Sequence, residues 1–287
     1  MKNKGFLNRM SSNIINKHYS DNQAKLWNSL QGEEDIPSLD YLLNFQFQNL
    51  STTKSLVTYN KSGLALEINE SSRENEIIDE NTIFLSPSKS SVKISTILDK
   101  RHSVRQYEKH TMSFKDFSSI IHYSFGVKSV TELNRKITYQ RYHSSSGGLY
   151  PIDVYIFVNE VENIPSGVYK YQPISNSLML ICELSINEFS KVFANNVIDI
   201  VNSNFVVCFA NSFEKIYLKY GELSLALLFI ETGIMAQNCH LNAVARKIGS
   251  CDIGGFDKRA LEHYLGLINT TDNILYCLSV GKERNDF

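Results

Sequence analysis

Cysteine and proline are scarce in this sequence, with five of each among 287 residues. The cysteines are an odd number without a Cys-x-x-Cys pair, and His240 beside Cys239 lacks the spacing of zinc ligands. A disulfide framework and a metal site are therefore not expected. Such cysteine usage suits a reducing compartment, so we expect a cytoplasmic protein.

The sequence also lacks an excess of charge of either sign. Its 29 Lys and Arg residues balance 30 Asp and Glu residues, which gives a formal net charge of -1. Such a chain has no bulk electrostatic field that would gather nucleic acid or anionic lipid. We expect no nucleic-acid partner, and any anion site must come from a local cluster of side chains.

Long hydrophobic runs are missing as well. Residues 223–234 form one of the longest, and Ser224 and Glu231 interrupt it, whereas a helix needs about 20 apolar residues to span a bilayer. Basic residues near the N-terminus precede a mostly polar stretch, residues 8–17, where a signal peptide would be apolar. We expect neither a membrane span nor export. The apolar residues, 43% of the chain, are enough for a sizeable core.

Composition divides the chain into two parts. Residues 1–90 are rich in Asn, Ser and Glu, residues 39–45 have helical spacing, and the turn residues at 86–91 are typical of a linker. We predict an N-terminal extension over residues 1–90, a helical arm that is a candidate for peptide or partner recognition. Residues 91–287 are predicted to form the main domain.

Hydrophobic periodicity in the main domain predicts an α+β fold with a mixed central sheet covered by helices. Ser113 is the expected N-cap of a helix over residues 113–123, and Gly126 its expected end. A long buried helix is predicted over residues 222–248, ended by Gly249. The expected core strands cover residues 153–159 and 205–210, and a last strand is expected over residues 273–280. A hairpin outside the core is expected from residues 167–172 and 177–181.

Two polar segments of the main domain are candidates for binding an anion. Arg101-His102-Ser103-Val104-Arg105 holds two guanidinium groups and a hydroxyl within five residues, and guanidinium forks bind phosphate oxygens. Taken alone, this segment fits a solvated helix end better than a phosphate site.

The second segment contains Ser145, Ser146, Gly147 and Gly148, just before a predicted strand. Paired glycines let the backbone approach a ligand closely while its N–H groups point at acceptor atoms. A plain Ser/Gly turn that enters the strand is the alternative.

Further candidates lie in the second half of the chain. Lys219 and Tyr220 are a possible base and its partner, although the same residues fit a mixed-charge surface turn. Gln237 and Asn238 interrupt an apolar helix, so their amides need partners, either a cofactor or neighbouring backbone.

Six segments come in the order and approximate spacing of the SagB-type dehydrogenases: residues 101–107, 145–151, 219–221, 236–238, 253–257 and 280–282. Over residues 92–284 the chain resembles these McbC-like, FMN-dependent azoline dehydrogenases of the nitroreductase superfamily. The resemblance implies a nitroreductase-like fold. It also implies oxidation of thiazoline or oxazoline rings to thiazoles or oxazoles in a ribosomally synthesised peptide, as in bacteriocin or cytolysin biosynthesis.

The resemblance assigns roles to individual residues. It makes Lys219 and Tyr220 catalytic, and it implies FMN contacts for Arg101, His102, Ser103, Arg105, Ser145, Ser146, Gly147, Gly148, Gln237, Gly254, Gly255, Gly281 and Lys282. A homodimer, a peptide substrate with a leader and a complex with a cyclodehydratase are implied as partners. The chain departs from the family pattern at Ser144, where a proline is usual, and at residues 223–226, where an arginine or tyrosine is frequent.

Azoline oxidation removes a proton from one ring carbon and passes a hydride from the neighbouring carbon to the flavin, so the protein must supply a base. A lysine whose pKa is lowered by burial can serve. Two alternatives remain open. One is an NAD(P)H-dependent flavin reductase of dehydroamino acids in a lanthipeptide, or of nitro compounds or quinones. The other is a non-catalytic partner that keeps the fold and stabilises a peptide-modifying complex.

Overall fold

The computed structural model describes residues 76–133, 136–193, 197–268 and 270–284. The helix expected at residues 39–45, and most of the predicted N-terminal extension, lie outside the described residues. The strands of the described part of the chain are β1 (Ile83–Phe84), β2 (Val127–Leu133), β3 (Lys136–Arg141), β4 (Ile152–Val158), β5 (Gly167–Gln172), β6 (Ser177–Glu183), β7 (Phe205–Asn211), β8 (Gly249–Ile253) and β9 (Asn273–Gly281). Its α-helices are α6 (Ile94–Lys100), α7 (Phe114–Phe125), α8 (Ile186–Phe189), α9 (Phe213–Tyr220), α10 (Ser224–Val244) and α11 (Lys258–Tyr264).

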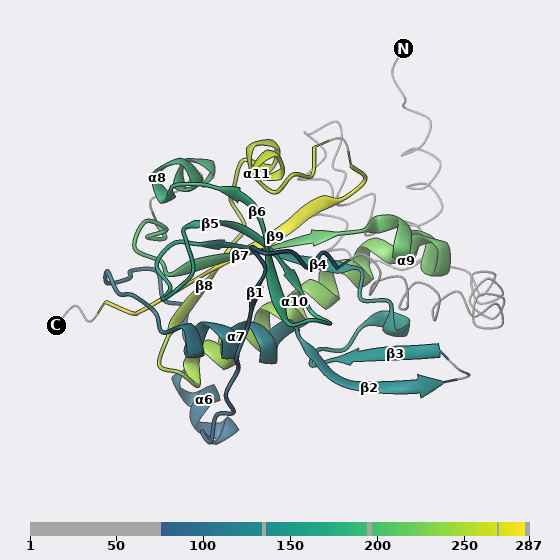
Figure 1. The fold of residues 1–287 in the computed structure, drawn as a ribbon, viewed down its shortest axis with the longest axis horizontal. Coiled ribbons are helices and arrows are strands. Elements are labelled where there is room, and N and C mark those ends of the chain that lie inside the picture. Colours follow the sequence, from purple (N-terminus) through teal and green to yellow (C-terminus); the bar gives the residue numbers. More distant parts are fainter. Residues whose placement is uncertain (1–75, 134–135, 194–196, 269, 285–287) are drawn as a thin grey trace, which may run out of the picture. The chain divides into compact units, whose positions relative to one another are not determined.

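Seven strands form one sheet in the order β1-β6-β5-β4-β7-β9-β8, and β2 pairs with β3 in a separate ribbon (Figure 1). Neighbouring strands of the large sheet are all antiparallel. Its parallel component comes from isolated bridges, such as that between Ser103 and Ser250 of β8. The expected α+β fold, with helices over a central sheet, is confirmed.

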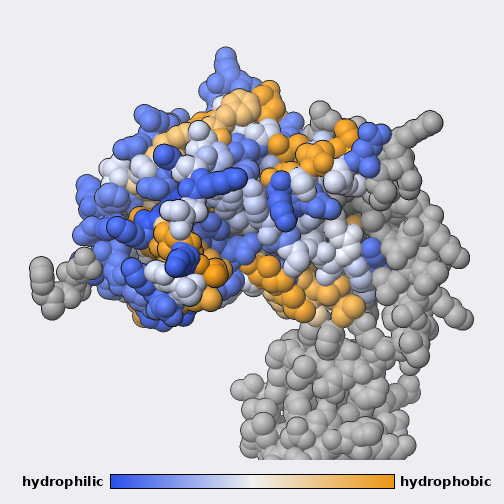
Figure 2. Space-filling model, turned by 90° about the horizontal axis from the view of Figure 1, so that it is seen from below, coloured by the Kyte–Doolittle hydropathy of each residue, from blue (hydrophilic) through white to orange (hydrophobic). Residues whose placement is uncertain are grey.

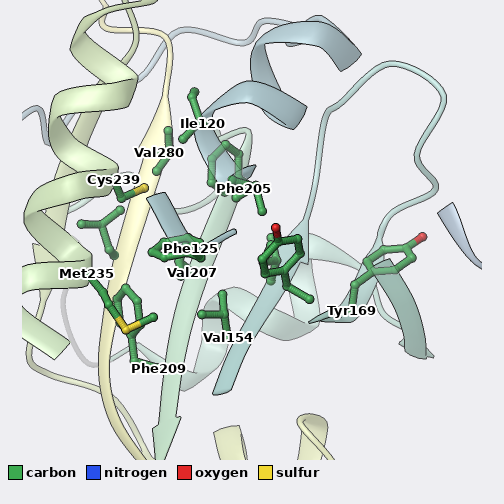
Figure 3. Packing of buried hydrophobic residues seen from close by; sticks show 14 of the residues in the cluster. Ile120, Phe125, Val154, Tyr169, Phe205, Val207, Phe209, Met235, Cys239 and Val280 are labelled. Carbon is green, nitrogen blue, oxygen red and sulfur yellow. The ribbon is translucent and has the colours of Figure 1, made fainter. Parts of the chain in front are cut away.

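The core explains why β7 is apolar at almost every position. All seven of its residues are buried, because its two faces pack against different layers. On one face, Phe205 lies edge-on to Phe117 of α7 at a ring-centroid distance of 5.1 Å. Figure 3 shows side chains of β7 and α10 pointing toward one another on this face, among them Phe209 and Met235.

The other face of the sheet is covered by α8 and α11. Val206, Cys208 and Ala210 of β7 belong to a second buried cluster that includes Leu261 of α11. Phe189 of α8 stacks on Phe157 of β4, with 4.0 Å between the ring centroids. The sheet therefore lies between two layers of helices.

Several predicted elements are confirmed by the structure. Ser113 caps α7, since its side chain accepts a hydrogen bond from the backbone N–H of Asp116, and the helix ends before Gly126. The two predicted core strands correspond to β4 and β7, and the predicted last strand corresponds to β9. Within the described residues, no helix combines the length and the apolarity needed to cross a membrane.

Two predictions about the fold were wrong. The hairpin expected outside the core is β5 and β6, which pair with β4 inside the large sheet. The long helix ends at Val244, and the residue with a left-handed backbone after it is Lys247, with a φ of 59°. Gly249 instead begins β8, where a Cβ atom would lie 2.6 Å from Val104, so close packing requires glycine there.

The sheet also includes residues from before position 91. Ile83 and Phe84 of β1 pair with β6 at the sheet edge. The Gln172 side chain both accepts a hydrogen bond from the backbone of Ile77 and donates one to it. Residues from at least Ile77 onward thus pack as part of the main domain.

Candidate active site

The segment at residues 101–105 lies beside the C-terminal end of the described chain. The backbone N–H of Glu108 donates to the carbonyl of Lys282 at 2.9 Å, and that of Arg284 donates to the carbonyl of Gln106 at 3.1 Å. Two segments far apart in sequence therefore run side by side. The pairing brings the backbone that follows the Arg101 to Arg105 segment beside that of Lys282.

Side chains of this segment differ in their surroundings. Val104 is buried against Gly249 of β8. The His102 imidazole lies 2.8 Å from a carboxylate oxygen of Glu283, and this hydrogen bond raises the pKa of His102. His102 is thus engaged by a carboxylate, and Ser103, Arg101 and Arg105 are the better candidates for phosphate contact.

A cavity of about 560 Å³ adjoins this segment, between α6 and the C-terminal end of α10. His102 and Lys282 line it together with Lys100 and Lys247, and Ile97 is among its apolar lining. Asp99 and Glu283 line the cavity as well, and Arg101, Ser103 and Arg105 are not among its lining residues. The donors that suit a flavin phosphate are the two guanidinium groups and the hydroxyl of residues 101–105, together with the Lys282 ammonium.

Lys219 and Tyr220 lie at the C-terminal end of α9, against the loop that contains Gly147. Gly147 has a φ of 64°, and a Cβ atom on it would lie 2.3 Å from Lys219 Nζ and 2.6 Å from Tyr220 Oη. The Lys219 ammonium lies 5.3 Å from the centroid of the Tyr220 ring. The structure thus brings both proposed catalytic side chains against the Ser/Gly loop.

Burial prepares the two side chains for proton transfer. Lys219 is only 6% exposed, and burial lowers the pKa of its amine because the charged form is poorly solvated. Burial raises the pKa of Tyr220, which stays a hydrogen-bond donor at neutral pH. The lowered pKa makes the Lys219 amine easier to deprotonate, and a deprotonated amine can accept a proton from a bound molecule.

Ser145 points into the protein. Its hydroxyl donates to Glu231 Oε2 at 2.7 Å and accepts from the backbone N–H of Tyr150 at 2.8 Å. Ligand contacts of this loop would therefore come from Ser146, Gly147 and Gly148. Glu231 was missed as a site residue, and its signal was a carboxylate within an apolar helix.

The remaining predicted cofactor residues fall into two groups. Gln237 lies on the exposed side of α10 and lines a cavity of about 370 Å³ with Asp252 and Tyr276. Gly254 and Gly255 are exposed after β8, with open space where a Cβ atom would stand. Gly281 is different, because it is buried and a Cβ atom there would lie 2.8 Å from the Tyr107 ring.

The two halves of the predicted site lie at opposite ends of α10. Residues 244–249, at its C-terminal end, contribute to the cavity beside residues 101–105, whereas α9 leads into its N-terminal end. A helix of 21 residues is about 30 Å long. Figure 1 shows α6 and α9 on opposite sides of the chain. One chain does not bring Arg101 close to Lys219.

Comparison with known proteins identifies the family to which this fold belongs. Residues 98–282 match the nitroreductase family, and the chain belongs to that family. Within the described residues, no group of three or more His, Cys, Asp or Glu side chains is placed to hold a metal ion.

Three relatives illustrate the match. A Methanocaldococcus jannaschii protein described as a nitroreductase is 28% identical over 165 residues, 58% of this chain and 80% of the relative. A Ralstonia eutropha structure described as a nitroreductase has a TM-score of 0.59 and 19% identity, over 72% of this chain and 91% of that one. A chain of the Escherichia coli microcin synthetase McbBCD complex, with truncated pro-MccB17 bound, has a TM-score of 0.55 and 19% identity, over 88% and 99%. At these identities the two structural matches establish the fold.

Proposed function

We propose that this protein is an FMN-dependent dehydrogenase that oxidises thiazoline or oxazoline rings to thiazoles or oxazoles in a ribosomally synthesised peptide. The observation that carries the proposal is the buried Lys219 amine, held with Tyr220 against the Gly147 loop. A reductase that takes hydride from a nicotinamide has no need of such a base. The likeness to a chain of the microcin synthetase complex over 88% of this chain supports the same reading.

Each residue of the proposed site has its own role in the reaction. Bound FMN would accept the hydride from the ring. Lys219, in its neutral form, takes the proton from the neighbouring ring carbon, and Tyr220 donates a hydrogen bond that holds the ring in place. Arg101, Arg105 and Lys282 bind the flavin phosphate, and Ser103 adds a hydroxyl donor.

A homodimer completes the site in this proposal. Two copies of α10 packed antiparallel bring the C-terminal end of one helix beside the N-terminal end of the other, which forms two equal sites. The helix has a face suited to this contact, since Phe229 is 52% exposed and Ile230 57% exposed, and Gly233 and Gln237 are exposed along the same side. Figure 2 shows that hydrophobic residues gather in patches on the surface of the molecule.

Further partners follow from the proposed chemistry. The substrate is a peptide with a leader, and a cyclodehydratase supplies the azoline rings before oxidation. Residues 1–90 are the candidate for recognising the leader or this partner enzyme. A reducing cytoplasm, where such peptides are made, fits the free cysteines, among them Cys208 and Cys277 in the core.

The test is reconstitution with an azoline-containing peptide. We expect purified protein to carry FMN and to lower the peptide mass by about 2 Da per ring, for one hydride and one proton. Lys219→Ala and Tyr220→Phe should keep the flavin and lose this mass change. Lys215→Ala and Tyr217→Phe on the same helix are matched controls and should retain it.

Other outcomes would point to the alternatives. Full activity of both Lys219→Ala and Tyr220→Phe would contradict the proposed roles. Rapid bleaching of the flavin by NADPH without peptide, and no mass change with it, would instead indicate a flavin reductase, which the relative described as a nitroreductase favours. Purified protein without flavin would indicate a non-catalytic partner.

A further inference from the structure

Glu231 is a carboxylate in the buried part of α10. It is 2% exposed, and Leu228, Thr232 and Met235 around it on the helix are buried as well. Burying a carboxylate costs several kcal/mol or more unless partners compensate, and an apolar residue would stabilise the helix at least as well. The position of Glu231 therefore calls for an explanation beyond packing.

The contacts of Glu231 all lead to one loop. Its Oε2 accepts the hydrogen bond from Ser145 Oγ at 2.7 Å, and its Oε1 lies 3.6 Å from His143 Nε2. Burial lowers the pKa of His143, so the imidazole is neutral at neutral pH. Arg141 interacts with Glu231 electrostatically from the start of the same segment. The carboxylate thus joins α10 to residues 141–145.

This connection continues to the proposed base. The Ser145 hydroxyl accepts a hydrogen bond from the backbone N–H of Tyr150, and the Ser145 carbonyl accepts one from the backbone N–H of Gly148. Between them, the Gly147 backbone packs on Lys219 and Tyr220. A displacement of Ser145 would therefore move the backbone that covers the lysine.

We propose that Glu231 is a positioning residue, which fixes the Ser145 loop through the Ser145 hydroxyl and thereby keeps the Lys219 amine desolvated. The inference rests on the proposed function, because it takes Lys219 as the base of that reaction. Glu231 is connected to Lys219 through the Ser145 loop, by way of its hydrogen bond with Ser145.

Three substitutions separate this role from simple packing. Glu231→Gln keeps an oxygen that accepts from Ser145, and it should retain most of the activity. Glu231→Leu removes that acceptor while filling a similar volume, so it should fold with an unchanged or higher Tm and lose about tenfold or more in kcat with little change in KM. Thr232→Val, next to Glu231 and also buried, is the matched control and should behave as wild type.

The decisive readout is the reactivity of Lys219 itself. Purified full-length protein is treated with an amine-reactive reagent over a range of pH, and modification of Lys219 is followed by peptide mapping. Lys219 should react at a lower pH than an ordinary lysine in the wild-type protein and in the Glu231→Gln and Thr232→Val variants. In Glu231→Leu, the midpoint should rise toward that of an ordinary lysine, as the amine regains solvent. Ser145→Ala removes the donor of the same bond and should give the same rise, which covers the case that Glu231→Leu fails to fold.

An unchanged Lys219 profile in both Glu231→Leu and Ser145→Ala would overturn the proposal, as would equal loss of activity in Glu231→Gln and Glu231→Leu. The labelling does not depend on azoline oxidation. If wild type fails to oxidise an azoline peptide while the Lys219 profile still shifts, the proposed function fails and the positioning role stands.

Discussion

Two ionisable residues of the candidate site, Lys219 and His102, differ in how deeply they are buried. Lys219 is 6% exposed and has a lowered pKa, whereas the His102 side chain is 60% exposed and has a raised pKa through Glu283. Burial thus disfavours the charged form of Lys219, whereas the carboxylate of Glu283 favours the charged form of His102.

His143 makes the stability of the protein depend on pH. Burial places its folded pKa below the ordinary value of 6.5, despite the opposing effect of Glu231. As the pH falls below about 6.5, the unfolded chain takes up a proton that the folded chain does not, so stability present above this pH is lost toward the folded pKa. The slope from one such group is at most about 1.4 kcal/mol per pH unit.

Calorimetric unfolding over this pH range checks the prediction. His143→Gln, which cannot titrate, should show a shallower loss of stability on acidification than wild type. Equal slopes in the two proteins would mean that His143 is solvated in the folded chain, contrary to its burial.

Residues of the candidate site could be predicted from the sequence only where several of them lie together in one short segment. Lys219 with Tyr220 and the Arg101 to Arg105 segment follow from local sequence and resemblance. The hydrogen bond between Ser145 and Glu231 joins residues 86 positions apart, and nothing in the local sequence specifies that Ser145 turns inward. For this reason the sequence reasoning gave Ser145 to the cofactor and missed Glu231.

At the scale of elements, the Ser/Gly loop is the structure on which the proposed base depends. Gly147 and Gly148 both have positive φ, of 64° and 68°, so an alanine at either position costs about 1 to 2 kcal/mol in backbone strain. Only at Gly147 would the new Cβ also displace Lys219 and Tyr220.

Comparison of the two alanine variants isolates that contact. Gly147→Ala should lose about tenfold or more in turnover of an azoline peptide, and Gly148→Ala should lose less with a similar drop in Tm. Steady-state kinetics with thermal unfolding of both proteins gives the answer. Equal losses of turnover would show that strain in the loop, and not the position of Lys219, limits activity.

The elements themselves were predictable where one strong local signal decides them. The Ser113 cap and apolar spacing define α7, and continuous apolar residues define β7. The place of β5 and β6 in the sheet depends on pairing between β5 and β4, which no local pattern encodes. The end of α10 was misplaced because Gly249 looked like a helix stop, whereas its contact with Val104 in the folded chain requires glycine.

At the scale of the whole molecule, we propose that residues 101–105 of one copy and Lys219 of another copy form one flavin site. The segment and the lysine lie at opposite ends of α10, which is about 30 Å long, so a site within one chain would need one of them to be elsewhere. The sequence order of the motifs gave no indication of this separation, because order does not report which end of a helix each motif occupies.

Complementation between two inactive variants tests this claim most directly. One variant carries Arg101→Ala with Arg105→Ala, and the other carries Lys219→Ala; they are mixed, allowed to exchange subunits, and assayed on an azoline peptide. Random exchange should restore about one quarter of wild-type activity, because half of the dimers are mixed and each has one intact site. Lys219→Ala mixed with Tyr220→Phe, both lesions in the same half, should restore nothing. No recovery in the first mixture, with mixed dimers demonstrably formed, would contradict a site shared between two copies.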